Sequence, residues 1–220
     1  MKILFATVPG DGHFNPLTGI AMHLCDAGHD VRWYAGPHYI PKVERLGIPV
    51  YPYKRATEIT GENIGTLFPK RAKLRGPALI RFDGKTMMVA NVGNYFEDIQ
   101  EIDQIFPFDI LFCDAAFYAM KLVKEKLSKQ VSTVGVAPSV ETSKDVPPNF
   151  VGLRPAKSAI GKRFYQGLRA LMEWMVMKDV KALYNEILSA HGLPPIDGSL
   201  FDVAYRSPDV VFQSGVPGFA

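Results

Sequence analysis

The chain has 220 residues, of which 47% are hydrophobic and 21% are charged, and its formal net charge is +3. This composition is typical of a globular protein and excludes intrinsic disorder, collagen-like repeats and disulfide-dense scaffolds. No apolar run approaches the ~18 residues of a membrane span, and the N-terminal apolar segment is too short for a signal peptide. The two cysteines, Cys25 and Cys113, stand far apart in apolar stretches, which indicates buried free thiols in a soluble, cytoplasmic protein.

Short apolar runs alternate with helical patterns along most of the chain. This alternation predicts an α/β protein with a Rossmann-like, doubly wound, mainly parallel sheet and helices on both faces. For the first five strands, the expected order in the sheet is 3-2-1-4-5. The predicted strands cover residues 3–8, 31–35, 49–53, 109–113, 131–136 and, as a last buried strand, 209–213.

Caps and helical spacing predict the helices. Asn15 as the cap and Pro16 as the first residue predict a helix that ends at Ala27, with Gly28 behind it. Further helices are expected over residues 40–46, 86–105, 116–127, 160–191 and 200–205. The helix over 160–191 carries an apolar stripe of Phe164, Leu168, Leu171, Met175, Leu183 and Ile187.

Residues 54–85 interrupt this pattern, with eight basic residues against three acidic ones. We expect an exposed insertion with broken helix. Its cations could contact an anionic membrane surface, but a solvated loop is the more common role of such a run and is favoured here. Nucleic acid is not an expected partner, because no aromatic platform or nucleic-acid-binding pattern accompanies the charge.

The segment VPGDGHFNPLTGIA follows the first predicted strand, where open α/β sheets bind ligands. A dinucleotide fingerprint would need a glycine in place of Asn15, and a P-loop would need Gly-Lys in place of Asn15 and Pro16. What remains is Gly10 and Gly12, followed at once by His13. A helix N-terminus disfavours imidazolium and would keep His13 neutral, as a general base must be. The alternative is a loop histidine that caps or packs locally.

Asp114 stands at the C-terminal end of the fourth predicted strand. Because the first and fourth strands are neighbours in a doubly wound sheet, His13 and Asp114 are expected side by side at one edge. A carboxylate behind a histidine orients the ring and stabilises the imidazolium that forms when the ring takes a proton. The alternative for Asp114 is an N-cap of the next helix.

Three runs, GHFNPL at residues 12–17, HLCDAGHDVRWYAG and DILFCDAAFYA, resemble the N-terminal domain of GT-B-fold glycosyltransferases. The likeness is greatest to family 1, the UDP-glycosyltransferases that modify small acceptors. VVFQSGVPGFA resembles the family's junction with its second domain. The resemblance implies that residues 1–214 form a Rossmann-like acceptor-binding domain and residues 215–220 begin an interdomain linker. It also implies that the C-terminal donor-binding domain is absent from this chain.

The resemblance implies inverting transfer of a sugar from a nucleotide-sugar, with a UDP-sugar expected, to an acceptor hydroxyl. By position, His13 matches the general base and Asp114 its paired aspartate, while Gly12 and Asn15 are expected near the donor. No metal or other cofactor is expected, because the family needs none and the histidines and cysteines show no ligand spacing. Without the donor signature of the missing domain, the chain alone is expected to bind acceptor, hold donor poorly and lack turnover.

The expected partner is a small lipophilic acceptor, for which aromatic and methionine side chains make an adaptable pocket. Core packing is the alternative role of such side chains, and the loop over residues 137–158 is a further candidate wall. Two rival functions stay open: transfer to a lipid-linked acceptor at a membrane, and a non-catalytic ligand-binding domain. The candidate acceptor residues are Phe14, Phe82, Met87, Met88, Asn91, Phe117 and Tyr118.

Overall fold

The structure is a computed structural model that describes residues 1–143, 145–148 and 151–213. Its strands are β1 (Lys2–Ala6), β2 (Asp30–Ala35), β3 (Val50–Pro52), β4 (Ile110–Asp114), β5 (Gln130–Gly135) and β6 (Val210–Gln213). Its α-helices are α1 (Asp11–Asp26), α2 (Ile40–Glu44), α3 (Ile64–Leu67), α4 (Gly76–Asp83), α5 (Val92–Ile105), α6 (Met120–Leu127), α7 (Ala159–Met172), α8 (Lys178–Ala190) and α9 (Leu200–Arg206). A 3-10 turn, η1 (Pro69–Lys73), and two π-helical turns, η2 (Gly84–Val89) and η3 (Glu173–Met177), complete the elements of these ranges.

The six strands form one sheet in the order β3-β2-β1-β4-β5-β6, and every neighbouring pair is parallel. The predicted Rossmann-like, doubly wound fold and the order of its first five strands are therefore confirmed. β1 and β4 are direct neighbours, with Ala6 opposite Cys113. The chain therefore leaves the ends of β1 and β4 at the same edge of the sheet.

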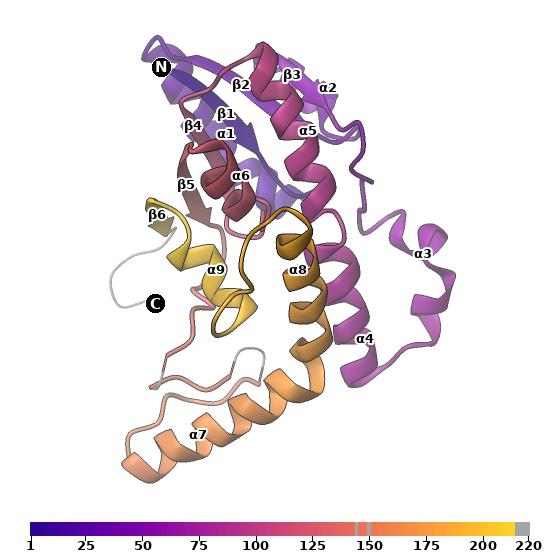
Figure 1. Cartoon of the computed structure of the whole chain (residues 1–220), viewed down its shortest axis with the longest axis vertical. Helices are drawn as coiled ribbons and strands as arrows, with labels where there is room; N and C mark the ends of the chain where they lie inside the picture. Colours follow the sequence, from indigo (N-terminus) through magenta and orange to yellow (C-terminus); the bar gives the residue numbers. More distant parts are fainter. Residues whose placement is uncertain (144, 149–150, 214–220) are drawn as a thin grey trace.

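Helices cover both faces of the sheet (Figure 1). Successive side chains of a strand point to opposite faces. In β1, Leu4 and Ala6 join a core cluster with α5, α6, α8 and α9, whereas Ile3 and Phe5 join a second cluster with α1 and α2. A shift of one residue in the pairing of β1 would exchange these two sets, so the two cores fix its register.

Helix α1 begins earlier than predicted. The N–H of His13 donates to the carbonyl of Gly10 at 3.0 Å, so the first helical turn forms ahead of Asn15. Pro16 lies inside the helix, where it removes a single backbone donor near the exposed N-terminal end. The prediction that Asn15 caps the helix is wrong, and His13 lies in the first turn of α1 instead of the preceding loop.

The predicted helix over residues 160–191 is one helical run that changes direction at η3, so that α7 extends away from the sheet (Figure 1). The apolar stripe divides at this bend. Leu183 and Ile187 in α8 pack against the core, whereas Phe164 is 61% exposed and Leu171 is 49% exposed. The stripe is therefore a core face only beyond the bend, and α7 itself contains no buried residue.

The segment over residues 54–85 contains the short helices α3 and α4 and the turn η1, as the prediction of broken helix requires. Its cations are less free than the sequence suggests. Arg55 pairs with Glu101, and Arg71 pairs with Asp83 at 2.7 Å. These ion pairs compensate part of the positive charge that would otherwise be available to an anionic surface.

A buried carboxylate, Asp98, ties the start of this segment to α5. Its side chain is 2% exposed and accepts a hydrogen bond from the Tyr34 hydroxyl at 2.7 Å. It also accepts from the backbone N–H groups of Lys54 at 2.9 Å and Arg55 at 3.1 Å. The chain that follows β3 is thereby held against α5. The sequence of this segment shows only that the alternation of strands and helices is interrupted.

The last strand, β6, lies at the edge of the sheet beside β5. Val210 is 47% exposed and Phe212 is 49% exposed. The prediction of a buried strand is therefore wrong, because a short apolar run does not distinguish an edge strand from a central one. The predicted linker at residues 215–220 lies outside the described residues.

Both cysteines are free thiols. Cys113 in β4 is buried, and this burial raises the pKa of its thiol well above the ordinary value. Cys25 on α1 is only partly buried, so the prediction of a buried thiol holds for Cys113 alone.

Candidate active site

Asp114 occupies the last position of β4, at the edge where the chain leaves the sheet. Its side chain is fully buried. Oδ2 accepts a hydrogen bond from the N–H of Val8 at 2.9 Å, and Oδ1 accepts one from the N–H of Ala116 at 2.8 Å. Two backbone donors from separate loops therefore fix the carboxylate without help from a ligand.

His13 meets this carboxylate from the first turn of α1. Its Nδ1 lies 3.0 Å from Oδ1 of Asp114, and its side chain is 34% exposed. A carboxylate is only an acceptor, so Nδ1 carries the proton and Nε2 is left as the basic nitrogen. Within the described ranges, Nε2 has no hydrogen-bond partner. The side-by-side placement predicted for the two residues is thus observed, and Asp114 contacts both the ring and the N–H of Ala116.

Two opposing effects act on the His13 ring. Burial disfavours the imidazolium, whereas the hydrogen bond and the negative charge of Asp114 favour it. Their net effect raises the pKa of His13 above its ordinary value of 6.5. This direction is opposite to the one that was predicted from the helix N-terminus alone, because Asp114 favours the imidazolium.

Gly10 lies directly against the ring. A Cβ added to this glycine would stand 3.0 Å from Cδ2 of His13, whereas its φ of 168° is extended backbone that any residue adopts. A glycine at this position therefore favours the close approach of the ring, and its backbone angles do not require it. Gly12 and Asn15, the predicted donor-binding residues, lie exposed near the start of the same helix.

Comparison with known proteins finds a curated relative and solved structures of glycosyltransferases. The chain is 30% identical over 218 residues to 4'-demethylrebeccamycin synthase of Lentzea aerocolonigenes, a match that covers 99% of this chain and 52% of that protein. Among solved structures, the calicheamicin glycosyltransferase CalG4 superposes with a TM-score of 0.64 at 16% identity, covering 96% of this chain and 47% of CalG4. The spinosyn rhamnosyltransferase SpnG complexed with thymidine diphosphate gives a TM-score of 0.56 at 13% identity, covering 99% of this chain and 48% of SpnG. No protein-family model matches the chain.

This chain has the fold of the N-terminal half of a GT-B glycosyltransferase. The predicted resemblance is thereby confirmed at the level of the fold. The chain spans about half the length of the curated relative and of the solved structures that it matches.

Three of the predicted acceptor residues lie in the core of this GT-B half. Phe14 is 3% exposed and packs on Trp33, with 4.8 Å between ring centroids. Phe117 is fully buried, and Tyr118 is 3% exposed. In this arrangement they offer a ligand almost no surface, which agrees with core packing, the alternative raised by the sequence.

The other predicted acceptor residues lie around η2. Phe82 packs edge-on against Phe68, Met87 is exposed, and Met88 packs partly buried against the core. Asn91 is buried, and its amide accepts a hydrogen bond from the N–H of Thr57 at 3.0 Å and donates one to the carbonyl of Thr57 at 2.7 Å. None of these predicted residues lines the pocket described next.

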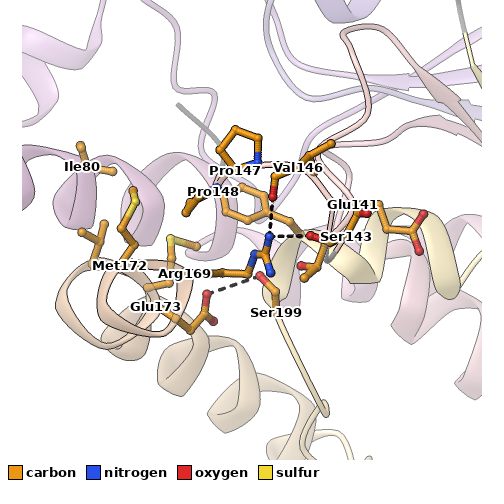
Figure 2. Close-up of a pocket in the computed structure, with 14 residues that line it drawn as sticks. Ile80, Glu141, Ser143, Val146, Pro147, Pro148, Arg169, Met172, Glu173 and Ser199 are labelled. Atoms are coloured by element: carbon orange, nitrogen blue, oxygen red, sulfur yellow. Dashed lines mark hydrogen bonds between the residues drawn. The ribbon is translucent and has the colours of Figure 1, made fainter. Parts of the chain in front are cut away.

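A pocket that no sequence motif predicts lies among α4, the loop after β5, α7, η3 and α9 (Figure 2). It encloses about 640 Å³ of empty space, part of which is open to solvent. Four separate stretches of chain build it, so no local motif marks it in the sequence. Residues 141–143 and 146–148, which belong to the loop that was a candidate wall of the acceptor site, form one side of this pocket. Lining residues include Ile80, Val146, Arg169, Glu173, Ser199 and Phe201.

In residues 1–143, 145–148 and 151–213, no group of three or more His, Cys, Asp or Glu side chains is arranged to hold a metal ion. No helix in the same ranges has both the length and the apolar character needed to cross a bilayer.

Proposed function

We propose that this chain is the acceptor-binding half of an inverting glycosyltransferase that moves a sugar from a nucleoside-diphosphate donor to a hydroxyl of a small lipophilic molecule. The observation that carries the proposal is the contact between His13 and the buried Asp114 at the ligand-binding edge of the sheet. The fold and the curated relative support it, because both point to glycosyl transfer.

In the proposed reaction His13 is the general base. Its Nε2 takes the proton of the acceptor hydroxyl while the hydroxyl oxygen attacks the anomeric carbon of the sugar. The bond between that carbon and the nucleoside diphosphate breaks, and its electron pair leaves with the phosphate. Asp114 holds the ring through Nδ1 and stabilises the imidazolium that forms.

The donor is proposed to approach the N-terminal end of α1, where Gly12 and Asn15 are exposed. Backbone N–H groups and the positive end of the helix dipole favour phosphate at such a terminus. A UDP-sugar is the donor expected from the resemblance. A TDP-sugar is the second candidate donor, because SpnG, which has a similar fold, was solved with thymidine diphosphate bound.

The test is a transfer assay on the native protein as its source cells make it, with UDP-glucose and TDP-glucose offered separately to a panel of aromatic and macrocyclic alcohols. We expect product by mass spectrometry with at least one donor, and a loss of about a hundredfold or more in His13→Ala. Full activity in that variant would overturn the role of His13. Absence of product with every pair, from protein that is folded by circular dichroism, would favour a non-catalytic binding domain.

A further inference from the structure

The peptide group between Thr7 and Val8 lies directly after β1, whose paired register ends at Ala6. Its carbonyl oxygen, on Thr7, accepts a hydrogen bond from the Tyr53 hydroxyl at 2.9 Å. Its N–H, on Val8, donates to Oδ2 of Asp114 at 2.9 Å. A single peptide group therefore joins the side chain of Tyr53 to the carboxylate that contacts the candidate base.

The two hydrogen bonds hold this peptide group from opposite sides. The C=O and N–H of a trans peptide point in opposite directions, so each reaches toward a different neighbour of the strand. Tyr53 follows β3 and Asp114 ends β4, and these strands lie on the two sides of β1 in the sheet. Just beyond the end of β1, two side chains thus fix the course of the chain.

The path continues from the peptide group to His13. Asp114 accepts from Val8 at Oδ2 and contacts Nδ1 of His13 at Oδ1, 3.0 Å away. Both oxygens belong to one rigid carboxylate, so a rotation that follows a change at Oδ2 also moves Oδ1. The hydroxyl of Tyr53 and the ring of His13 are therefore the two ends of one chain of hydrogen bonds.

Tyr53 is itself firmly placed. Its ring packs against Tyr34 and Tyr95, with 4.6 Å and 5.3 Å between the ring centroids. Its N–H donates to the carbonyl of Ala35 at 3.1 Å. Burial raises the pKa of Tyr53 well above its ordinary value, so the hydroxyl keeps its proton over the pH range in which a histidine titrates. Tyr53 is thus a permanent donor to the Thr7 carbonyl.

The hydrogen bond from Tyr53 also strengthens the one that follows it. A donor to the carbonyl of a peptide group polarises that group and makes its N–H a better donor. Asp114 is fully buried, so backbone N–H groups, and not water, must hold its carboxylate. Removal of the Tyr53 hydroxyl would weaken one of these holds.

We propose that Tyr53 is a positioning residue for His13 and acts through the Thr7–Val8 peptide group and Asp114. The proposal rests on the proposed function, because the alignment of the ring matters for sugar transfer only if His13 takes the proton of the acceptor. It gives the residue just after β3 a role in holding the base that lies beyond β1.

The first test is an NMR titration of the His13 ring in the native protein. Tyr53→Phe removes the hydroxyl and keeps the ring with its packing, and circular dichroism checks that the variant is folded. We expect the pKa of His13 to fall below that of the wild type, because a carboxylate that is held less firmly favours the imidazolium less. Tyr34→Phe is the matched control, since its hydroxyl donates to Asp98 at 2.7 Å and lies outside the path. It should leave the titration of His13 unchanged.

The second test is a double-mutant cycle on sugar transfer. Tyr53→Phe should lower kcat about fivefold, which corresponds to the loss of one average hydrogen bond. In a His13→Ala background the same change should have no further effect, because no ring is left to position. A general disturbance of the structure would instead lower transfer by the same factor in both backgrounds.

Two results would overturn the proposal: a wild-type titration of His13 in Tyr53→Phe, or a fivefold loss that persists in the His13→Ala background. The titration needs no nucleotide-sugar, so its failure is distinct from failure of the proposed function. A lowered pKa of His13 in a protein that transfers no sugar would reject the proposed reaction and support the path from Tyr53 to His13. Sugar transfer with an unchanged titration would reject the path alone.

Discussion

Gly10 approaches the ring of His13 so closely that a Cβ on this glycine would stand 3.0 Å from Cδ2. To make room, the ring would have to shift by a few tenths of an ångström, and the same ring contacts an oxygen of Asp114 at 3.0 Å. Gly10 therefore acts as a positioning residue for the candidate base, and its role can be separated from that of the base itself.

We expect Gly10→Ala to lower sugar transfer about tenfold, because a small displacement of a catalytic group is costly even when the group is present. Gly19→Ala is the matched control, since a Cβ added at this position of α1 meets no atom within 4 Å. Steady-state kinetics of both variants give the comparison. Equal rates for Gly10→Ala and wild type would show that the ring tolerates the added methyl group.

The pH dependence of transfer should report the influence of Asp114 on the base. Because the pKa of His13 is raised above 6.5, activity should fall as the pH drops through that raised value and the ring becomes protonated. In Asp114→Asn the negative charge is gone and burial acts alone, so the pKa of His13 should fall and the acidic limb should move to lower pH.

The maximal rate of Asp114→Asn should also fall, on the order of a hundredfold, because an amide can hold the wrong tautomer of the ring. The measurement is a pair of pH–rate profiles, supported by NMR titration of the His13 ring. An acidic limb at the same pH in both proteins would exclude Asp114 as the source of the shift.

Asp98 should contribute to the stability of the fold and not to the sugar-transfer reaction. Asp98→Ala leaves the buried Tyr34 hydroxyl and the N–H groups of Lys54 and Arg55 without their acceptor. We expect a loss of about 3 kcal/mol in the free energy of unfolding, or roughly 6–12 °C in Tm for a chain of this size. Asp26→Ala, at an exposed position, is the control in the same thermal melts. A change in Tm no larger than that of the control would contradict the assigned role.

The two tryptophans should respond differently to quenchers. Trp33 is fully buried between β2 and α1, whereas Trp174 at the bend of the long helix is 65% exposed. We expect iodide to quench only the fluorescence of Trp174, so Trp174→Phe should leave a blue-shifted emission that iodide does not reduce. Strong quenching in that variant would show that the face of β2 against α1 is open to solvent.

The local sequence was sufficient for the sheet and for the candidate base. Apolar runs of strand length alternate with helical spacing, and this alternation admits few topologies other than a doubly wound sheet. Once β1 and β4 are neighbours, the residues just beyond them must meet. The contact between His13 and Asp114 therefore follows from the chain order, although the start of α1 was misplaced because Asn15 and Pro16 imitate a helix N-terminus.

The pocket and the surface of α7 were decided only by the tertiary structure. A helical period shows that a face is apolar but not what covers it, so Phe164 and Leu183 look alike in the sequence while one is exposed and the other packs on the core. Phe14 and Phe117 follow the ends of β1 and β4 yet turn into the core. The pocket arises because α4, α9 and the loop after β5 converge on η3, and no spacing along the chain encodes that convergence.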